Sequence, residues 1–233
     1  MGAASSPLLS CTDLTVRVPG RLLVDKLDFE LHSGELLAVL GQNGAGKTLT
    51  MLSLAGLRDA DAGSVLLGGH DIHTMPRPEV AKQLALLPQV MDDVFPATVM
   101  DTALIGRHPH IGRFQWESDK DKGIAARALA DVGLEELADR DIFTLSGGER
   151  RRLAIAQVLS QTPDVYLLDE PSNHLDPQHQ LDALHVFREA ANNGAGVIAN
   201  LHDVNLAVRF ADHCLLLFGD GRWQLGNKDE VLT

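Results

Sequence analysis

A glycine-rich segment near the N-terminus has the residue types and spacing that bind phosphate. The pattern G-x-x-x-x-G-K-[ST] is matched in full by Gly41, Gln42, Asn43, Gly44, Ala45, Gly46, Lys47 and Thr48. Glycine permits backbone conformations that a Cβ forbids, so consecutive N–H groups can surround an anion. Lys47 adds a cation for the β- and γ-phosphates, and the hydroxyl of Thr48 is a hard oxygen ligand for Mg²⁺. The segment therefore predicts a site for a nucleotide and its magnesium ion.

A pair of acidic residues closes an apolar run in the second half of the chain. Asp169 and Glu170 directly follow the run from Val165 to Leu168. Two carboxylates at the end of a buried strand are costly unless a cation or a substrate uses them. Asp169 is placed to hold Mg²⁺, and Glu170 is placed to polarise an attacking water as a general base. A solvated strand end is the alternative, and the complete phosphate loop favours the catalytic interpretation.

A second glycine motif, Leu145 to Glu149, reads Leu-Ser-Gly-Gly-Glu and precedes a helical pattern. Ser146 and Glu149 have the spacing of a capping box, so the motif is compatible with an ordinary helix start. The N–H groups of Gly147 and Gly148 at a helix N-terminus also suit a second anion site. Both interpretations are open on these residues alone. The following run, 150–152, consists of three arginines and is typical of a solvated helix face, although one of them could approach a phosphate.

The composition narrows the class of protein. The chain has 233 residues, 45% of them hydrophobic, and a formal net charge of -12. Because an acidic chain repels nucleic-acid phosphates, we expect no nucleic-acid partner. No apolar run approaches the roughly 20 residues that span a bilayer, so work at a membrane would require a partner.

Short apolar runs alternate with helical patterns, which predicts an α/β fold with a mostly parallel sheet. Buried strands are expected at 36–40, 165–168 and 197–201, a helix from about 48 to 56, antiparallel strands at 14–18 and 27–31, and a terminal hairpin at 215–225. Residues from about 92 to 160 have a mainly helical pattern. We therefore expect one domain, with a nucleotide-binding core and its N-terminal β layer at 1–91 and 161–233 and a helical insert at 92–160.

With these motifs in this order, the chain resembles the ABC ATPase family over nearly its whole length. Leu145 to Glu149 looks like the signature motif of that family, and Gln89 looks like its Q-loop glutamine. Ser172 to Asp176 is similar to its D-loop, and His202 to its switch histidine. The resemblance implies a P-loop NTPase core of the ABC type, an antiparallel β layer and a helical signature subdomain.

The resemblance also implies a mechanism of ATP hydrolysis in a head-to-tail homodimer that encloses two ATP molecules. One copy would supply the phosphate loop, Gln89, Asp169, Glu170 and His202 to each site, and the other copy would supply Ser146, Gly147 and Gly148. His202 would contact the γ-phosphate and act with Glu170 in catalysis.

Further roles follow from the same resemblance. Gln89 would join Thr48 and Asp169 at the magnesium ion, and Asp176 would belong to the nucleotide-binding residues. One feature departs from the family pattern, because many members have an aromatic residue near 16–18, where the adenine stacks. This chain has Val16, Arg17 and Val18 there, so how the adenine is held is open.

A short segment in the helical insert narrows the resemblance further. Ala103 to His110 reads Ala-Leu-Ile-Gly-Arg-His-Pro-His and is similar to a stretch in the ATPases of importers for iron chelates, haem and vitamin B12; residues 229–233 resemble their C-terminal region. This implies integral-membrane permease subunits, a periplasmic or extracellular substrate-binding protein and a peripheral location at the cytoplasmic face of the inner membrane. Because the substrate contacts belong to those partners, the sequence does not name the transported molecule.

Two other classes compete with this interpretation. A soluble ABC ATPase without a permease, such as one serving iron–sulfur cluster assembly, would share all of the ATP chemistry. A small-molecule kinase with a phosphate loop would leave Leu145 to Glu149 without a role.

Overall fold

The computed structural model describes residues 6–89, 96–112, 115–173 and 175–232. Residues 92–95 at the start of the predicted insert, His174 of the D-loop and Thr233 lie outside these ranges. The strands are β1 (Leu9–Val18), β2 (Arg21–Leu31), β3 (Leu36–Gly41), β4 (Ala62–Leu67), β5 (His70–Asp71), β6 (Leu84–Leu87), β7 (Val165–Asp169), β8 (Gly196–Asn200), β9 (His213–Leu217) and β10 (Trp223–Asn227). The α-helices are α1 (Lys47–Leu54), α2 (Arg77–Gln83), α3 (Val99–Ile105), α4 (Asp119–Asp131), α5 (Gly147–Ser160), α6 (Pro177–Asn192), α7 (Val204–Phe210) and α8 (Lys228–Val231). Short 3₁₀ turns lie at His108–His110, Glu135–Leu137 and Ile142–Thr144.

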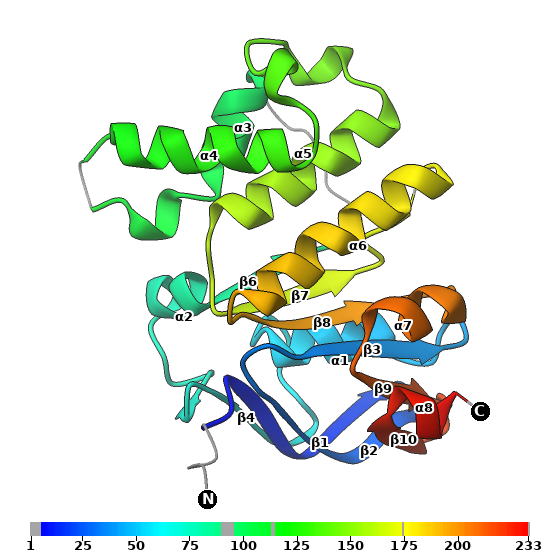
Figure 1. Cartoon of the computed structure of the whole chain (residues 1–233). Coiled ribbons are helices and arrows are strands. Elements are labelled where there is room, and N and C mark those ends of the chain that lie inside the picture. The colour runs from blue at the N-terminus through cyan, green and yellow to red at the C-terminus, as the bar shows by residue number, and fades with distance from the viewer. Residues whose placement is uncertain (1–5, 90–95, 113–114, 174, 233) are drawn as a thin grey trace, which may run out of the picture.

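The central sheet is six-stranded, in the order β10-β9-β3-β8-β7-β6 (Figure 1). All neighbouring strands from β9 to β6 run parallel, and β10 pairs antiparallel with β9. The predicted parallel sheet and terminal hairpin are therefore confirmed, with strand ends shifted by one or two residues. Strand β6, four residues long and directly after α2, was not predicted, and neither were β4 and β5 of the second sheet.

An antiparallel sheet in the order β2-β1-β4-β5 forms the predicted N-terminal β layer, below the central sheet in Figure 1. Both predicted strands start earlier than expected, at Leu9 and Arg21. Three shifts of register along β1, the first between Cys11 and Leu14, interrupt the alternation on which the prediction rests. Asp13 sits at φ 52° in that irregularity. Gly63 of β4 passes so close that a Cβ there would lie 2.4 Å from the Asp13 carbonyl oxygen.

The helices α3, α4 and α5 form the predicted helical insert, at the top of Figure 1. Each begins with a reciprocal capping box, formed by the pairs Thr98 and Asp101, Ser118 and Asp121, and Ser146 and Glu149. In the last pair the Ser146 N–H donates to Glu149 Oε2 at 2.7 Å. These bonds satisfy N–H groups that would otherwise lack an acceptor, and they fix where each helix starts.

Alternate residues of β3 belong to two different hydrophobic cores. Leu37 and Val39 pack with α1 and the β layer, so α1 lies between the two sheets. Leu36 and Ala38 face a second core that includes residues of α6 and of α3, α4 and α5. This alternation follows from the two-residue period of a strand.

None of the helices in the described residues has the length and apolar character that a bilayer crossing requires.

Candidate functional site

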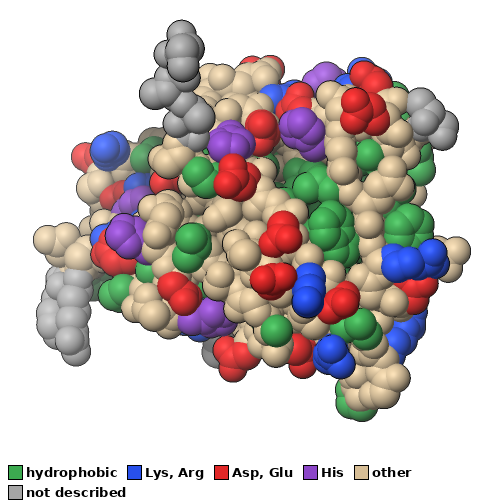
Figure 2. Space-filling model, turned by 90° about the horizontal axis from the view of Figure 1, so that it is seen from below, with side chains coloured by type: hydrophobic (Ala, Val, Ile, Leu, Met, Phe, Trp, Pro, Cys, Tyr) green, Lys and Arg blue, Asp and Glu red, His purple; other side chains and the backbone are tan. Residues whose placement is uncertain are grey.

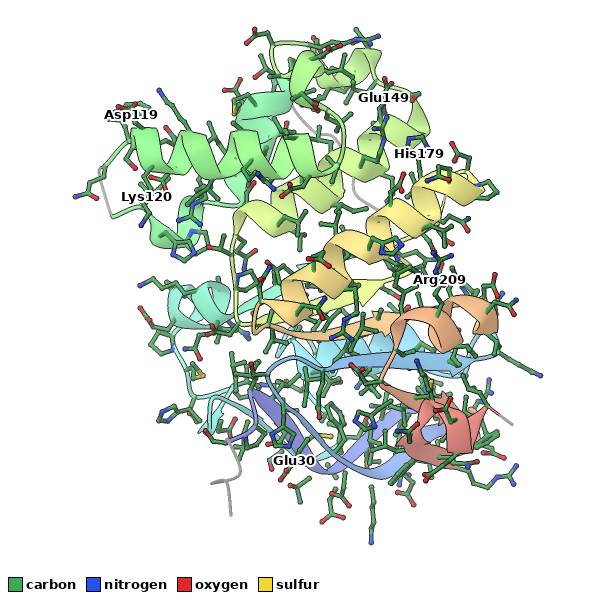
Figure 3. The ribbon with its side chains drawn as sticks, in the orientation of Figure 1. Glu30, Asp119, Lys120, Glu149, His179 and Arg209 are labelled. Atoms are coloured by element: carbon green, nitrogen blue, oxygen red, sulfur yellow. The ribbon has the colours of Figure 1, made fainter. Side chains whose placement is uncertain are left out.

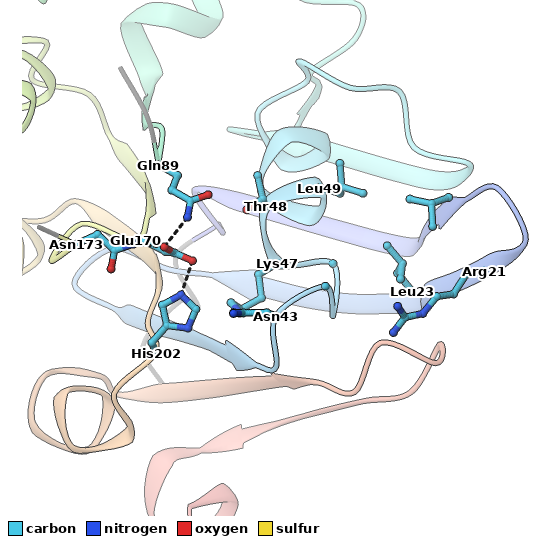
Figure 4. A pocket seen from close by; sticks show the side chains of 13 residues that line it. Arg21, Leu23, Asn43, Lys47, Thr48, Leu49, Gln89, Glu170, Asn173 and His202 are labelled. Atoms are coloured by element: carbon cyan, nitrogen blue, oxygen red, sulfur yellow. Dashed lines mark hydrogen bonds and ion pairs between the residues drawn. The ribbon is translucent and has the colours of Figure 1, made fainter. Parts of the chain in front are cut away.

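A cavity of about 700 Å³ lies at the carboxyl end of the central parallel strands. Its lining residues come from the β layer, the phosphate loop and the segments after β6, β7 and β8 (Figure 4). They are Val18, Arg21, Leu23, Asn43, Gly44, Gly46, Lys47, Thr48, Leu49, Gln89, Glu170, Asn173 and His202.

The phosphate loop connects β3 to α1. Gly44 and Gly46 adopt φ 76° and 105°, which glycine tolerates and a side chain would strain. Gly41 is required for a different reason, because a Cβ there would lie 2.5 Å from the Leu217 carbonyl oxygen of β9. The loop thus curls over the sheet edge and ends at the N-terminus of α1, where helix N–H groups can meet an anion.

Lys47 contributes the cation of the loop. Its Nζ donates to the carbonyl oxygens of Gly41 at 2.7 Å and Gln42 at 3.3 Å. Burial lowers the pKa of the Lys47 ammonium, and the carboxylates of Glu170 and Asp169 oppose that shift. The side chain is therefore held across the loop, within the electrostatic reach of the acidic pair.

The Glu170 carboxylate is the point at which three other side chains meet (Figure 4). Its Oε2 accepts from Gln89 Nε2 at 2.7 Å and from Asn173 Nδ2. Its Oε1 pairs with His202 Nε2. The predicted residues Gln89, Glu170 and His202 are thus brought together from three segments. Asn173 was missed as a site residue, although it belongs to the segment identified as D-loop.

Asp169, directly before Glu170, is not among the residues that line the cavity. Only 3% of the residue is exposed, and its Oδ1 accepts from Asn200 Nδ2 at 2.7 Å. The Asn200 Oδ1 is buried without a hydrogen-bond partner in the described structure. Asp169 is thus the last residue of β7, and Glu170 follows the strand and lines the cavity.

Several predicted residues lie elsewhere. Gly41, Gln42 and Ala45 belong to the loop but are absent from the cavity lining. The signature residues Ser146, Gly147 and Gly148 lie at the start of α5 in the helical insert, where Figure 3 labels Glu149.

Asp176 is also outside the cavity. It caps α6, accepting at Oδ1 from the N–H groups of Gln178 and His179. The pKa of Asp176 is lowered by these bonds and by that of the His179 side chain.

Arg151 corrects one prediction, that residues 150–152 form a solvated face. Only 6% of Arg151 is exposed, and its guanidinium donates to backbone carbonyls of residues 88–89 and 169–171. Burial lowers the pKa of Arg151, opposed by the carboxylates of Asp169 and Glu170. The sequence carried a usable signal, because residues 151, 154, 155 and 158 share one helix face and the last three are apolar.

In the described residues, no group of three or more His, Cys, Asp or Glu could hold a metal ion. The predicted magnesium ligands instead combine a hydroxyl, an amide and a carboxylate. Of these, Thr48 and Gln89 line the cavity.

A parallel sheet with a glycine-rich loop between β3 and α1 is characteristic of the phosphate-loop nucleotide-binding proteins. The family model described as ABC transporter matches residues 24–173. The chain therefore belongs to the ABC transporter ATPase family, whose ATP-binding domain hydrolyses ATP, and the resemblance inferred from the motifs is confirmed.

Individual relatives agree with this assignment. The chain is 44% identical to the hemin import ATP-binding protein of Deinococcus radiodurans over 92% of this chain and 82% of that protein. It is 38% identical to a cobalamin import ATP-binding protein of Halobacterium salinarum over 97% of this chain, which spans 56% of that longer protein. A solved structure described as an inward-facing, putative metal-chelate type ABC transporter aligns with a TM-score of 0.84 at 29% identity, covering 98% of this chain and 86% of that one.

Replacing Lys47 by Ala is expected to weaken MgATP binding about 10- to 100-fold, because one charge-assisted contact to the phosphates is lost while the loop amides remain. Isothermal titration measures the affinity. Lys82→Ala, which removes an exposed cation from α2, is the matched control and should bind normally. If Lys47→Ala leaves the MgATP affinity unchanged, the phosphates do not bind at this loop.

Proposed function

We propose that the chain is the ATP-hydrolysing subunit of an ABC importer that takes up an iron chelate, haem or a cobalamin-type molecule through a separate membrane permease. The observation that carries this proposal is the 44% identity to a hemin import protein over 92% of the chain. The likeness to a cobalamin import protein and to a metal-chelate type transporter supports the wider substrate range.

The assembly that we infer has two copies of this chain at the cytoplasmic face of the plasma membrane, bound to permease subunits. A periplasmic or extracellular binding protein would deliver the substrate. We expect no nucleic-acid partner, because an acidic protein repels nucleic-acid phosphates. The net charge is -12, and Asp and Glu side chains are spread over the face seen in Figure 2.

In the proposed hydrolytic step, Glu170 polarises the attacking water and His202 contacts the γ-phosphate. Glu170 has the position for this role, since its carboxylate lines the cavity beside the phosphate loop. Its contacts with Gln89 and His202 orient both of its oxygens. Lys47 and the loop N–H groups bind the phosphates. In phosphoryl transfer these groups stabilise the negative charge on the phosphoryl oxygens in the transition state.

A magnesium ion fits the donor set next to the phosphate loop. Thr48 offers a hydroxyl, and Gln89 donates from Nε2 to Glu170, which leaves its Oε1 for a cation. Asp169 adds a buried carboxylate, which a cation would stabilise. Such all-oxygen sets with substrate phosphates are the ligands that Mg²⁺ prefers, and the ion would neutralise phosphate charge.

The adenine end of the nucleotide would lie toward Val18, Arg21 and Leu23. No Phe, Tyr or Trp is among the described lining residues of the cavity, so other groups would have to contact the adenine. The Arg21 guanidinium is held by a 2.9 Å bond from Nε to the Gly219 carbonyl oxygen. A planar guanidinium in a fixed position is suited to stack on a base.

We further propose one domain over 1–233, whose helical signature subdomain at about 92–160 completes the site of a second copy. Ser146, Gly147 and Gly148 are absent from the lining of the cavity in their own chain. At the start of α5 Gly147 is exposed and Gly148 half-buried, and N–H groups at a helix N-terminus suit the γ-phosphate of an ATP bound by the other copy. Asp176 would join the nucleotide-binding residues from this same dimer interface.

The importer proposal predicts that the chain co-purifies with a polytopic membrane protein from detergent-solubilised membranes. The two should separate by size only after the complex is dissociated. A chain that elutes alone, or with iron–sulfur assembly proteins, would favour the soluble ATPase instead.

Glu170→Gln is expected to keep MgATP binding and to lower kcat at least about 100-fold, because the amide preserves shape but cannot act as a base. Steady-state phosphate release and isothermal titration measure the two quantities. A kcat within a few-fold of that of the unmodified protein would show that Glu170 is not the general base.

Mixing two inactive variants tests the composite site. Lys47→Ala disables a phosphate loop, and Gly148→Asp places a carboxylate where a phosphate needs bare N–H groups. In a mixed dimer both lesions fall in one composite site and the other site is intact, so some hydrolysis should return. As a second readout, cysteines introduced next to Gly44 and Gly148 should crosslink different chains when ATP is bound. Crosslinks confined to one chain would contradict the head-to-tail dimer.

A further inference from the structure

A buried guanidinium connects the signature helix to the backbone beneath the cavity. Arg151 lies in the second turn of α5 and is 6% exposed. Its Nη2 donates to the carbonyl oxygens of Glu170 at 2.6 Å and Asp169 at 3.0 Å, and its Nε to that of Pro171 at 3.2 Å. Its Nη1 donates to the carbonyl oxygen of Pro88 at 2.8 Å and, at 3.4 Å, to that of Gln89.

These acceptors belong to the two backbone segments that present Gln89 and Glu170. The side chains of both residues line the cavity and are joined at 2.7 Å, while their carbonyls are held from behind by Arg151. A single side chain therefore fixes the peptide groups on which the relative position of the amide and the carboxylate depends.

The backbone conformation of Glu170 explains why these hydrogen bonds from Arg151 are needed. Glu170 has φ 53°, a left-handed conformation that is unfavourable for a residue with a side chain. Strained backbone persists only where surrounding contacts determine it, and the shortest contact of Arg151 is to the carbonyl of this residue. Without the guanidinium, the turn would be free to relax and carry the carboxylate away from the cavity.

We infer that Arg151 is a positioning residue for ATP hydrolysis, which holds the Gln89 and Glu170 segments in register with each other and with the start of α5. The inference rests on the proposed role of Glu170 as the general base. Arg151 touches backbone and not the reacting atoms, so it acts through the two residues that it holds.

Geometry also explains why lysine cannot fully replace it. A guanidinium carries five N–H donors in a fixed planar fork, whereas an ammonium carries three on one nitrogen. A lysine at 151 would keep the charge near Asp169 and Glu170 but could not reach both backbone segments equally well.

The same helix supplies a matched control. Arg152 also donates to backbone carbonyls, at 2.8 Å to Val132 and at 3.1 Å to Gly133. Both acceptors lie in the helical insert, away from Gln89 and Glu170. Arg152→Gln thus removes an arginine–carbonyl contact from α5 without touching the catalytic turn.

The test compares Arg151→Gln, Arg151→Lys, Arg152→Gln and Glu170→Gln for kcat, KM, MgATP affinity by titration, and Tm. Because displacements of about 1 Å in a catalytic group cost on the order of 100-fold, Arg151→Gln is expected to lower kcat at least about 30-fold while MgATP affinity stays within about threefold. Arg151→Lys should recover part of the activity, and Arg152→Gln should keep kcat within about threefold.

Each outcome bears on the inference. A folded Arg151→Gln protein with a kcat near that of the unmodified chain overturns it, as does an equal loss of kcat in Arg152→Gln. If Arg151→Gln does not fold, Arg151→Lys decides: a folded, fully active lysine variant overturns the inference, and a selective loss of kcat supports it. Full turnover by Glu170→Gln would refute the general base itself, whereas an inactive Glu170→Gln beside an active Arg151→Gln refutes only the role of Arg151.

Discussion

The parallel pairing of β6, β7, β8 and β3 is the constraint on which the site depends. Parallel strands place their carboxyl ends at one edge of a sheet, and ligands bind in the crevice outside that edge. The phosphate loop follows β3, Glu170 follows β7, Gln89 comes two residues after β6, and His202 comes two residues after β8. Gln89 and His202, 113 positions apart in the chain, therefore meet around one carboxylate because β6, β7 and β8 share one direction. The two cores on the faces of the sheet hold that direction, since alternate side chains of β3 belong to one or the other.

Contacts on two sides hold the turn that carries Glu170. On the cavity side, Gln89, Asn173 and His202 contact the carboxylate of Glu170. On the opposite side, the Arg151 guanidinium holds the backbone of the same turn. A buried guanidinium is unfavourable unless its donors are satisfied, and here five carbonyl contacts and two nearby carboxylates compensate for the lost water. The position of Glu170 thus depends on the helical insert as well as on the strand that precedes it.

Motifs and apolar runs were enough to predict the class of fold, the phosphate loop, the hairpin and the helical insert, because each is encoded by local spacing. Local spacing does not encode β4, β5 and β6. β6 is a run of four residues without a period of its own, and its strand conformation is imposed by pairing with β7. The meeting of Gln89, Glu170 and His202 was expected only through the family resemblance, since nothing in the separate segments states that their strands are neighbours. The helix pattern could indicate that Arg151 is buried but not what it contacts, because its acceptor carbonyls lie 18 to 63 positions away in the chain. Asn173 lies only three residues from Glu170, and its contact depends on the shape of the turn between them, which the sequence pattern does not specify.

The core on the helical side of the sheet has a consequence for how the chain loses structure. It runs without interruption from Leu36 and Val197 in the strands to Ala103, Leu129 and Ile155 in the insert. A core that is shared in this way links the two parts energetically, because separating them would expose apolar surface on both. Amide hydrogens of α5 and β7 should then exchange with solvent through the same large opening events, as one cooperative unit, rather than through fraying of the insert alone.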